Sequence, residues 1–208
     1  MNASRFIAFY DAMLAIIMTL VVLEFDMPDP SHLFRLIPAF ICYGISFFWL
    51  GFMWISSYTA WEHLTKVSPR TLFMMLFSLF FSSFFPFSTT LVVENFMSKD
   101  AQVFYVSIVL LITLSNYMLT QSMNRDHSAP ILEALFMIPI NLTLFDLVIK
   151  ILGLLLCYFV WPPFGTISIF IAVIVLTTKL FIDSKIRCQR NCNLESDSQK
   201  KATDLKEI

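Results

Sequence analysis

The chain has few charged residues and almost no glycine. Lys, Arg, Asp and Glu make up 14% of its 208 residues, and only 4 Gly stand beside 23 Phe. An average globular protein has about 25% charged residues. This composition excludes a disordered chain and a nucleic-acid-binding protein, which needs a basic surface. The 4 Cys do not form a disulfide framework, so a stapled secreted domain is excluded as well.

The motifs of common enzymes are also absent. The sequence has no Gly-rich phosphate loop, HExxH, GxSxG or Cys/His cluster. We therefore expect no enzyme activity, no cofactor and no resident metal. The sequence TVGYG is missing too, which excludes an ion-selective filter of backbone carbonyls of that type.

Six long apolar runs are what the chain does have. A helix across a hydrocarbon core of about 30 Å takes about 20 residues. The runs that meet this length cover Phe6–Phe25, Leu36–Tyr58, Leu72–Val93, Ala101–Thr120, Leu135–Val160 and Phe164–Ile182. They are continuously apolar and lack the alternation of strands. We therefore predict an all-α integral membrane protein with six transmembrane helices.

The Lys and Arg residues outside these runs indicate the orientation. With six spans, ten of them fall on the side of the two termini and two, Arg35 and Lys99, on the other side. Basic residues collect on the cytoplasmic side, so both termini are expected in the cytoplasm of a multi-pass cell-membrane protein. We predict a transmembrane domain over residues 1–184 and a polar, disordered cytoplasmic tail over residues 185–208.

The first run contains a charge and an aliphatic stripe. Asp11 is costly inside a span and is expected to face a helix bundle or water. Arg5 lies off its face of the helix, so that a pair between them would cross a helix or subunit boundary. Ile16, Leu20 and Leu23 form one stripe, with Thr19 beside it. Such a stripe either faces lipid or a helix, or forms a constriction that gates by dewetting with Thr19 hydroxyls as ion ligands. The spacing does not choose between them.

Arg5-x3-Phe9-Tyr10-Asp11 and the segment from Ala15 to Glu24 carry a family resemblance. They resemble the opening helix of the transmembrane protein 175 family, potassium channels of bacterial membranes and animal endosomes and lysosomes. The family motif is RxxxFSD, and Tyr10 stands where Ser is usual. Many bacterial members end the second span with W-x-x-H-H, whereas here Ser57 and Tyr58 follow Trp54. Further matches are Ser46-Phe47 and Phe85-Pro86-Phe87-Ser88-Thr89-Thr90-Leu91, so that the resemblance extends over residues 5–94.

The resemblance implies a potassium-permeable channel without a filter loop. The first helices would surround a central pore in a homotetramer in the lipid bilayer, because the chain holds a single six-helix repeat. Ile16, Leu20 and Leu23 would form the pore constriction, and Thr19 would favour potassium, with conducted ions near Ile16 and Thr19. The motif residues Arg5, Phe9, Tyr10 and Asp11 would form a structural network near the cytoplasmic mouth. A single repeat with short loops favours a bacterial inner membrane.

Two alternatives belong to other classes of function. A proton- or ion-coupled secondary transporter would use Asp11 together with Asp146 and Lys150, which stand at i, i+4 in the fifth run and can contact on one helix face. The same two residues can instead be a helix-packing ion pair. A non-conducting scaffold or sensor would act through the tail.

Overall fold

The computed structural model describes residues 3–23, 37–61, 67–126 and 140–178. Within these ranges the chain is helical, with short turns and no strand. The helices are α1 (Ala3–Leu23), α2 (Ile37–Trp61), α3 (Pro69–Ser83), α4 (Phe85–Glu94), α5 (Lys99–Asp126), α7 (Ile140–Phe159) and a helix over Phe164–Thr178, called the 164–178 helix below. The predicted all-α fold is confirmed.

Each of the six predicted spans corresponds to helix in the structure. The segments Ser4–Leu23, Pro69–Glu94 and Lys99–Met123 are long and apolar enough to cross a membrane, and Phe40–Ile55 and Phe164–Thr178 are shorter apolar helices. The fifth span corresponds to α7. The predicted tail, residues 185–208, lies outside the described residues, as do the outer ends of several spans.

The third span is two helices where the sequence analysis predicts one. α3 ends at Ser83, and the Phe84 N–H bonds to the carbonyl oxygen of Phe81 at 3.2 Å. α4 then begins with Phe85 and Pro86. Proline has no N–H to give to a helix, and its ring collides with the carbonyl four residues earlier. Pro86 therefore breaks the helix within a continuously apolar run, which hydropathy alone cannot detect.

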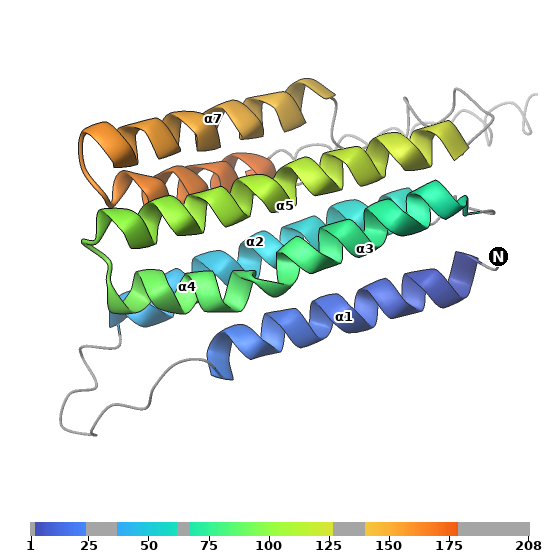
Figure 1. The fold of residues 1–208 in the computed structure, drawn as a ribbon, viewed down its shortest axis with the longest axis horizontal. Helices are drawn as coiled ribbons and strands as arrows, with labels where there is room; N and C mark the ends of the chain where they lie inside the picture. The colour runs from blue at the N-terminus through green and yellow to red at the C-terminus, as the bar shows by residue number, and fades with distance from the viewer. Residues whose placement is uncertain (1–2, 24–36, 62–66, 127–139, 179–208) are drawn as a thin grey trace, which may run out of the picture.

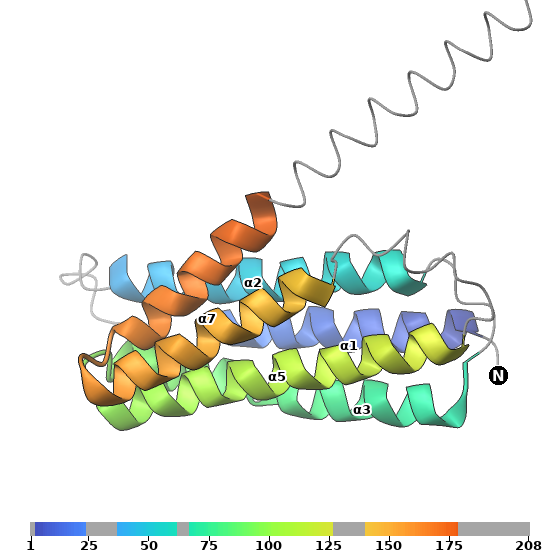
Figure 2. The same ribbon diagram turned by 90° about the horizontal axis from the view of Figure 1, so that it is seen from above.

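The helices run side by side along one long axis (Figure 1). α1 packs against α2, α3 and α4, while α5 packs against α3, α4 and α7. Seen from above, the 164–178 helix slants away from the other helices (Figure 2). α1 and α3 begin, and α5 ends, at the end where the N-terminus lies. This end therefore holds Arg5, Arg70 and Arg125, as expected for spans that alternate in direction.

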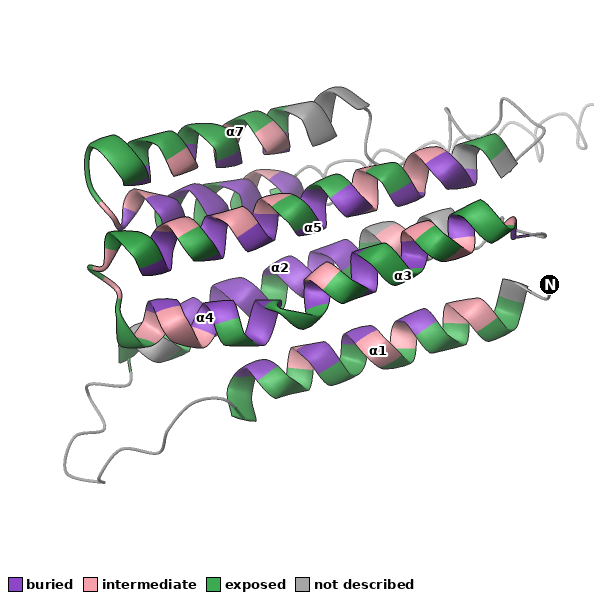
Figure 3. Ribbon diagram, in the orientation of Figure 1, coloured by how far each residue is buried: buried purple, intermediate pink, exposed green. Residues whose placement is uncertain are grey.

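The helices of the bundle carry both buried and exposed positions along their length (Figure 3). Large apolar side chains face outward, for example Phe48 and Phe159, which are 68% and 76% exposed. Ser46, Ser78 and Gln102 are fully buried. In a membrane, lipid solvates apolar side chains while polar ones seek partners inside the protein. The outer surface is thus suited to hydrocarbon.

Candidate functional site

α1 has two distinct faces. Tyr10, Leu14, Ile17 and Val21 repeat at intervals of four, three and four residues, and each is at most 2% exposed. This stripe packs into the bundle core, which fixes the rotation of the helix. The opposite face of α1 is therefore turned away from its own chain.

The predicted constriction residues lie on that outward face. Ile16, Leu20 and Leu23 are 52%, 38% and 74% exposed, and Thr19 beside them is exposed too. The Thr19 hydroxyl donates to the carbonyl oxygen of Ile16 at 2.9 Å. Because this bond uses its only hydrogen, the hydroxyl oxygen keeps its lone pairs for a ligand outside the chain. The face combines an apolar stripe with one oxygen donor.

Tyr10, the departure from the family motif, connects α1 to α2. Its ring is 1% exposed, and its hydroxyl lies 3.3 Å from the Ser57 hydroxyl. Ser57 is the residue that stands for the first His of the family pattern. The two departures from the motif therefore meet each other in space, while the side chain of Tyr58 lies outside the described residues.

Asp11 accepts a hydrogen bond from Trp54, which lies one helical turn before Ser57 on α2. The Trp54 Nε1–H donates to Asp11 Oδ1 at 2.9 Å. Trp54 and Ser57 are three residues apart, so they lie on the same face of α2 and reach consecutive residues of α1. Arg5 and Phe9, the other two motif residues, are exposed in the single chain. The structure thus brings two of the four motif residues, Tyr10 and Asp11, into contact with α2 and leaves the other two on the surface.

A second polar contact joins three helices deeper in the bundle. The Ser46 hydroxyl on α2 lies 3.0 Å from the Tyr105 hydroxyl on α5 and 3.3 Å from the Thr89 hydroxyl on α4. The Phe85 ring lies between Trp49 and Tyr105, at centroid distances of 5.1 and 5.9 Å. Ser46, Phe85 and Thr89 belong to the matched family segments, so these segments hold α2, α4 and α5 together behind α1.

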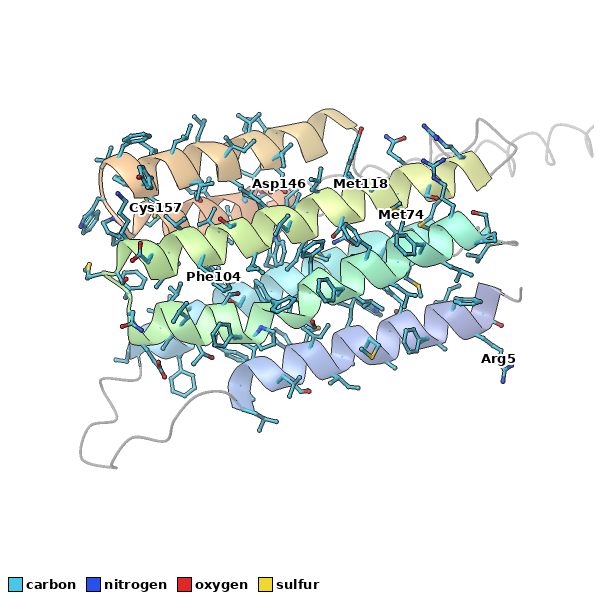
Figure 4. All side chains as sticks on the ribbon, in the orientation of Figure 1. Arg5, Met74, Phe104, Met118, Asp146 and Cys157 are labelled. Carbon is cyan, nitrogen blue, oxygen red and sulfur yellow. The ribbon has the colours of Figure 1, made fainter. Side chains whose placement is uncertain are left out.

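The charged pair of the fifth span is buried away from Asp11. Lys150 Nζ lies 2.5 Å from Asp146 Oδ2, and the two side chains are 1% and 7% exposed. α7 and α1 lie on opposite sides of the bundle in Figure 1, and Figure 4 shows Asp146 far from Arg5 at the start of α1. The structure therefore does not bring together the residues that a coupled transporter would combine. Among the described residues, no cluster of His, Cys, Asp or Glu is suited to a metal ion.

Sequence analysis missed several partners of the predicted residues. It did not assign Trp54 to Asp11, Ser57 to Tyr10, or Thr113 and Trp49 to Lys150. Each contact joins residues at least 37 positions apart. The one available signal was local: Trp54 and Ser57 share a face near the end of an apolar helix, where polar groups need partners.

Comparisons with known proteins agree with this geometry. The family model described as "Endosomal/lysosomal potassium channel TMEM175" matches residues 5–86. A potassium channel of Chryseobacterium sp. (strain P1-3) is 35% identical over 92 residues, which are 43% of this chain and 48% of the relative. A potassium channel of Streptomyces collinus (strain DSM 40733 / Tue 365) is 28% identical over 102 residues, 45% of this chain and 50% of the relative. The chain thus spans about half the length of these curated relatives.

The fold is similar to that of a solved structure. The crystal structure of a lysosomal potassium-selective channel TMEM175 homolog from Chamaesiphon minutus has a TM-score of 0.65 and 21% identity, and the match covers 86% of this chain and 97% of that one.

The fold, the apolar helices and the many exposed large apolar side chains define an all-helical integral membrane protein. Over residues 5–86 the chain is similar to the TMEM175 family, and its fold is similar to that of a solved TMEM175 homolog. The family is described as a channel family, in agreement with the expectation that the protein is not an enzyme.

Proposed function

We propose that this protein is a potassium-permeable channel whose pore is lined by the outward face of α1. The carrying observation is that one stripe of α1 is buried in its own chain while Ile16, Thr19, Leu20 and Leu23 are turned outward. The names of the two curated relatives, both potassium channels, support the same function.

The pore requires several copies of the chain. One bundle exposes α1 along one side and does not enclose an axis, so the outward faces of several α1 helices must meet to form a channel. We propose a homotetramer with α1 at its centre. Four copies of an aliphatic side chain at one level make a hydrophobic constriction, which controls ion passage by wetting and dewetting. Ile16, Leu20 and Leu23 would supply successive levels of this constriction.

Potassium preference is assigned to Thr19. Its hydroxyl hydrogen is bound within the helix, so its oxygen faces the proposed pore as an acceptor. A ring of such oxygens one turn from Ile16 replaces part of the hydration shell of a potassium ion, with no TVGYG loop. Conducted ions would therefore pause near Ile16 and Thr19.

The proposed setting is a bacterial inner membrane with both termini in the cytoplasm. Arg5, Arg70 and Arg125 lie at one end of the bundle, where the N-terminus is. Basic residues favour the cytoplasmic side of a membrane. Fluorescence quenching of a dye attached at each terminus, in right-side-out and inverted vesicles, tests this orientation.

The function is tested by cation flux into liposomes that contain the purified protein. We expect potassium flux that is electrogenic, does not saturate and exceeds sodium flux. Ile16→Asn should raise the flux, because a polar side chain keeps the constriction wet. Leu152→Asn is the matched control, since Leu152 is 53% exposed on α7 and Ile16 is 52% exposed on α1. Equal flux from Ile16→Asn and wild type would refute the constriction.

Selectivity has its own matched pair of variants. Thr19→Val removes the hydroxyl at constant shape and should lower the ratio of potassium to sodium flux. Thr178→Val on the 164–178 helix removes another exposed hydroxyl that donates to its own helix, at Ile174. This control should leave the ratio unchanged. A ratio that falls equally in both variants would remove Thr19 from the pore.

A further inference from the structure

Among the described side chains of α7, the two charged ones are buried and many large apolar ones are exposed. The buried positions are Asp146, Lys150, Gly153 and Cys157, at intervals of four, three and four residues. The apolar residues Phe145, Val148, Ile151, Leu152, Leu155 and Leu156 are exposed. In lipid, apolar surface does not select which face of a helix turns inward. The buried stripe, and the charged pair within it, therefore determines how α7 meets α5 and α2.

The Lys150 ammonium donates two hydrogen bonds. One goes to Asp146 Oδ2 at 2.5 Å, and the other goes to Thr113 Oγ1 on α5 at 2.8 Å. The ammonium also lies over the Trp49 ring on α2, with Nζ 5.1 Å from the ring centroid. Thr113 donates its own hydrogen to the Val109 carbonyl at 2.9 Å, so its oxygen can only accept from Lys150.

These partners are the groups that bind a free monovalent cation. A carboxylate and a hydroxyl oxygen are hard ligands suited to alkali cations, and an aromatic face attracts a cation through its quadrupole. The second carboxylate oxygen, Asp146 Oδ1, is buried and has no donor among the described residues. An ammonium on a tether reaches one oxygen of the carboxylate, whereas a free ion is able to contact both. The site therefore offers one oxygen ligand, Asp146 Oδ1, that the lysine does not use.

We propose that Asp146, Thr113 and Trp49 form a monovalent-cation site that Lys150 fills with its own ammonium. Lys150 is then a tethered cation: it neutralises the carboxylate, joins α7 to α5 and α2, and excludes a free potassium ion by occupying its place. This inference rests on the contact between α5 and α7 and is independent of the proposed conduction path along α1.

The test removes the tether and offers free cations instead. Lys150→Ala leaves the carboxylate, the hydroxyl and the ring in place and opens room at the former position of Nζ. We expect methylammonium and rubidium to raise the unfolding temperature of this variant more than that of the wild type, relative to N-methylglucamine, which is too large to enter. Comparison with the wild type subtracts any cation binding in the pore. The double variant Asp146→Asn/Lys150→Ala lacks the carboxylate charge and should show no extra rise.

Crystals of the same variants in rubidium give the location. We expect an anomalous peak between Asp146 and Thr113 in Lys150→Ala and none there in the wild type. A folded Lys150→Ala protein without any extra cation effect would overturn the proposal, and so would a rubidium peak beside an intact Lys150. If Lys150→Ala folds only when purified in methylammonium, that rescue supports the site. If it fails with every cation while the double variant folds, the proposal is wrong.

Discussion

Replacing Tyr10 by the residue usual in the family motif should damage this protein. Tyr10→Ser restores the RxxxFSD pattern, but the Tyr10 ring is 1% exposed and belongs to the hydrophobic core between α1 and its neighbours. A serine side chain fills little of that volume. A serine at position 10 would therefore leave a cavity in the core of this chain.

The magnitude follows from separating the ring from the hydroxyl. Removing a buried Phe or Trp side chain down to Ala costs about 3–5 kcal/mol in protein cores. We take the lower value, about 3 kcal/mol, for Tyr10→Ser. In lipid or detergent the loss of apolar side-chain surface costs less than in water, so the cost comes mainly from the cavity that the ring leaves. Tyr10→Phe keeps the ring and loses the hydroxyl with its bond to Ser57, and such bonds between membrane helices contribute about 0.6 kcal/mol. Tyr10→Ser should therefore be roughly five times as costly as Tyr10→Phe by these two estimates.

The partner position provides the second half of the test. Ser57→His supplies the larger side chain of the family pattern on the α2 side of the same contact. Alone it crowds the tyrosine, but combined with Tyr10→Ser it fills part of the cavity and restores a hydrogen-bond partner. We expect the double variant to be more stable than the sum of the single changes by about 1 kcal/mol or more, within the range of residues in direct contact.

The assay is reversible unfolding in mixed micelles at one protein concentration, followed by circular dichroism. Tyr10→Phe is the matched control for the hydroxyl. Equal losses from Tyr10→Ser and Tyr10→Phe would show that the ring does not fill a core. Strict additivity of Tyr10→Ser and Ser57→His would show that the two positions do not compensate, and the reasoning about this contact would fail.

Two further predictions concern close packing and buried polarity away from α1. A Cβ at Gly153 on α7 would collide with the Ser168 side chain of the 164–178 helix, while a Cβ at Gly44 on α2 meets nothing within 4 Å. Gly153→Ala should therefore lose about 1–3 kcal/mol of stability to overpacking, and Gly44→Ala should lose none. Thermal unfolding of the two variants measures this difference, and equal melting temperatures would contradict the close contact at Gly153. Gln102 Oε1 accepts from the Thr166 N–H at 3.2 Å and from its hydroxyl at 2.8 Å. Gln102→Leu leaves these donors unpaired at a cost of about 1–3 kcal/mol, and hydrogen exchange of the Thr166 amide should accelerate. An unchanged exchange rate would mean that this bond does not hold the first turn of the 164–178 helix.

Hydropathy and short motifs predict the spans of this protein but not the contacts between them. The apolar runs are local properties, so the six spans and the all-α class follow directly from the sequence. The outward stripe of α1 is likewise visible as a spacing, although the sequence could not say which stripe faces the bundle. The break before Pro86 is missed because its flanking residues are as apolar as the rest of the run.

The polar partners depend on tertiary packing. Asp11 had one evident charged candidate nearby in sequence, Arg5, yet it accepts from Trp54 on α2. The Asp146–Lys150 pair was visible as an i, i+4 spacing, but its surroundings come from α5 and α2. The i, i+4 spacing predicts that the two side chains pair. It does not predict which neighbouring helix the pair will contact.

The departures of this chain from the family motif follow from the same argument. Read along the sequence, Tyr10 for Ser and Ser57 for His are two separate irregularities that each weaken the motif. In the structure they are the two sides of one contact, with their hydroxyls 3.3 Å apart. Compared with the family pattern, the larger side chain stands on α1 and the smaller one on α2, and the two are in contact. Since α1 is the helix proposed to line the pore, this contact anchors its buried stripe on the side away from Ile16 and Thr19.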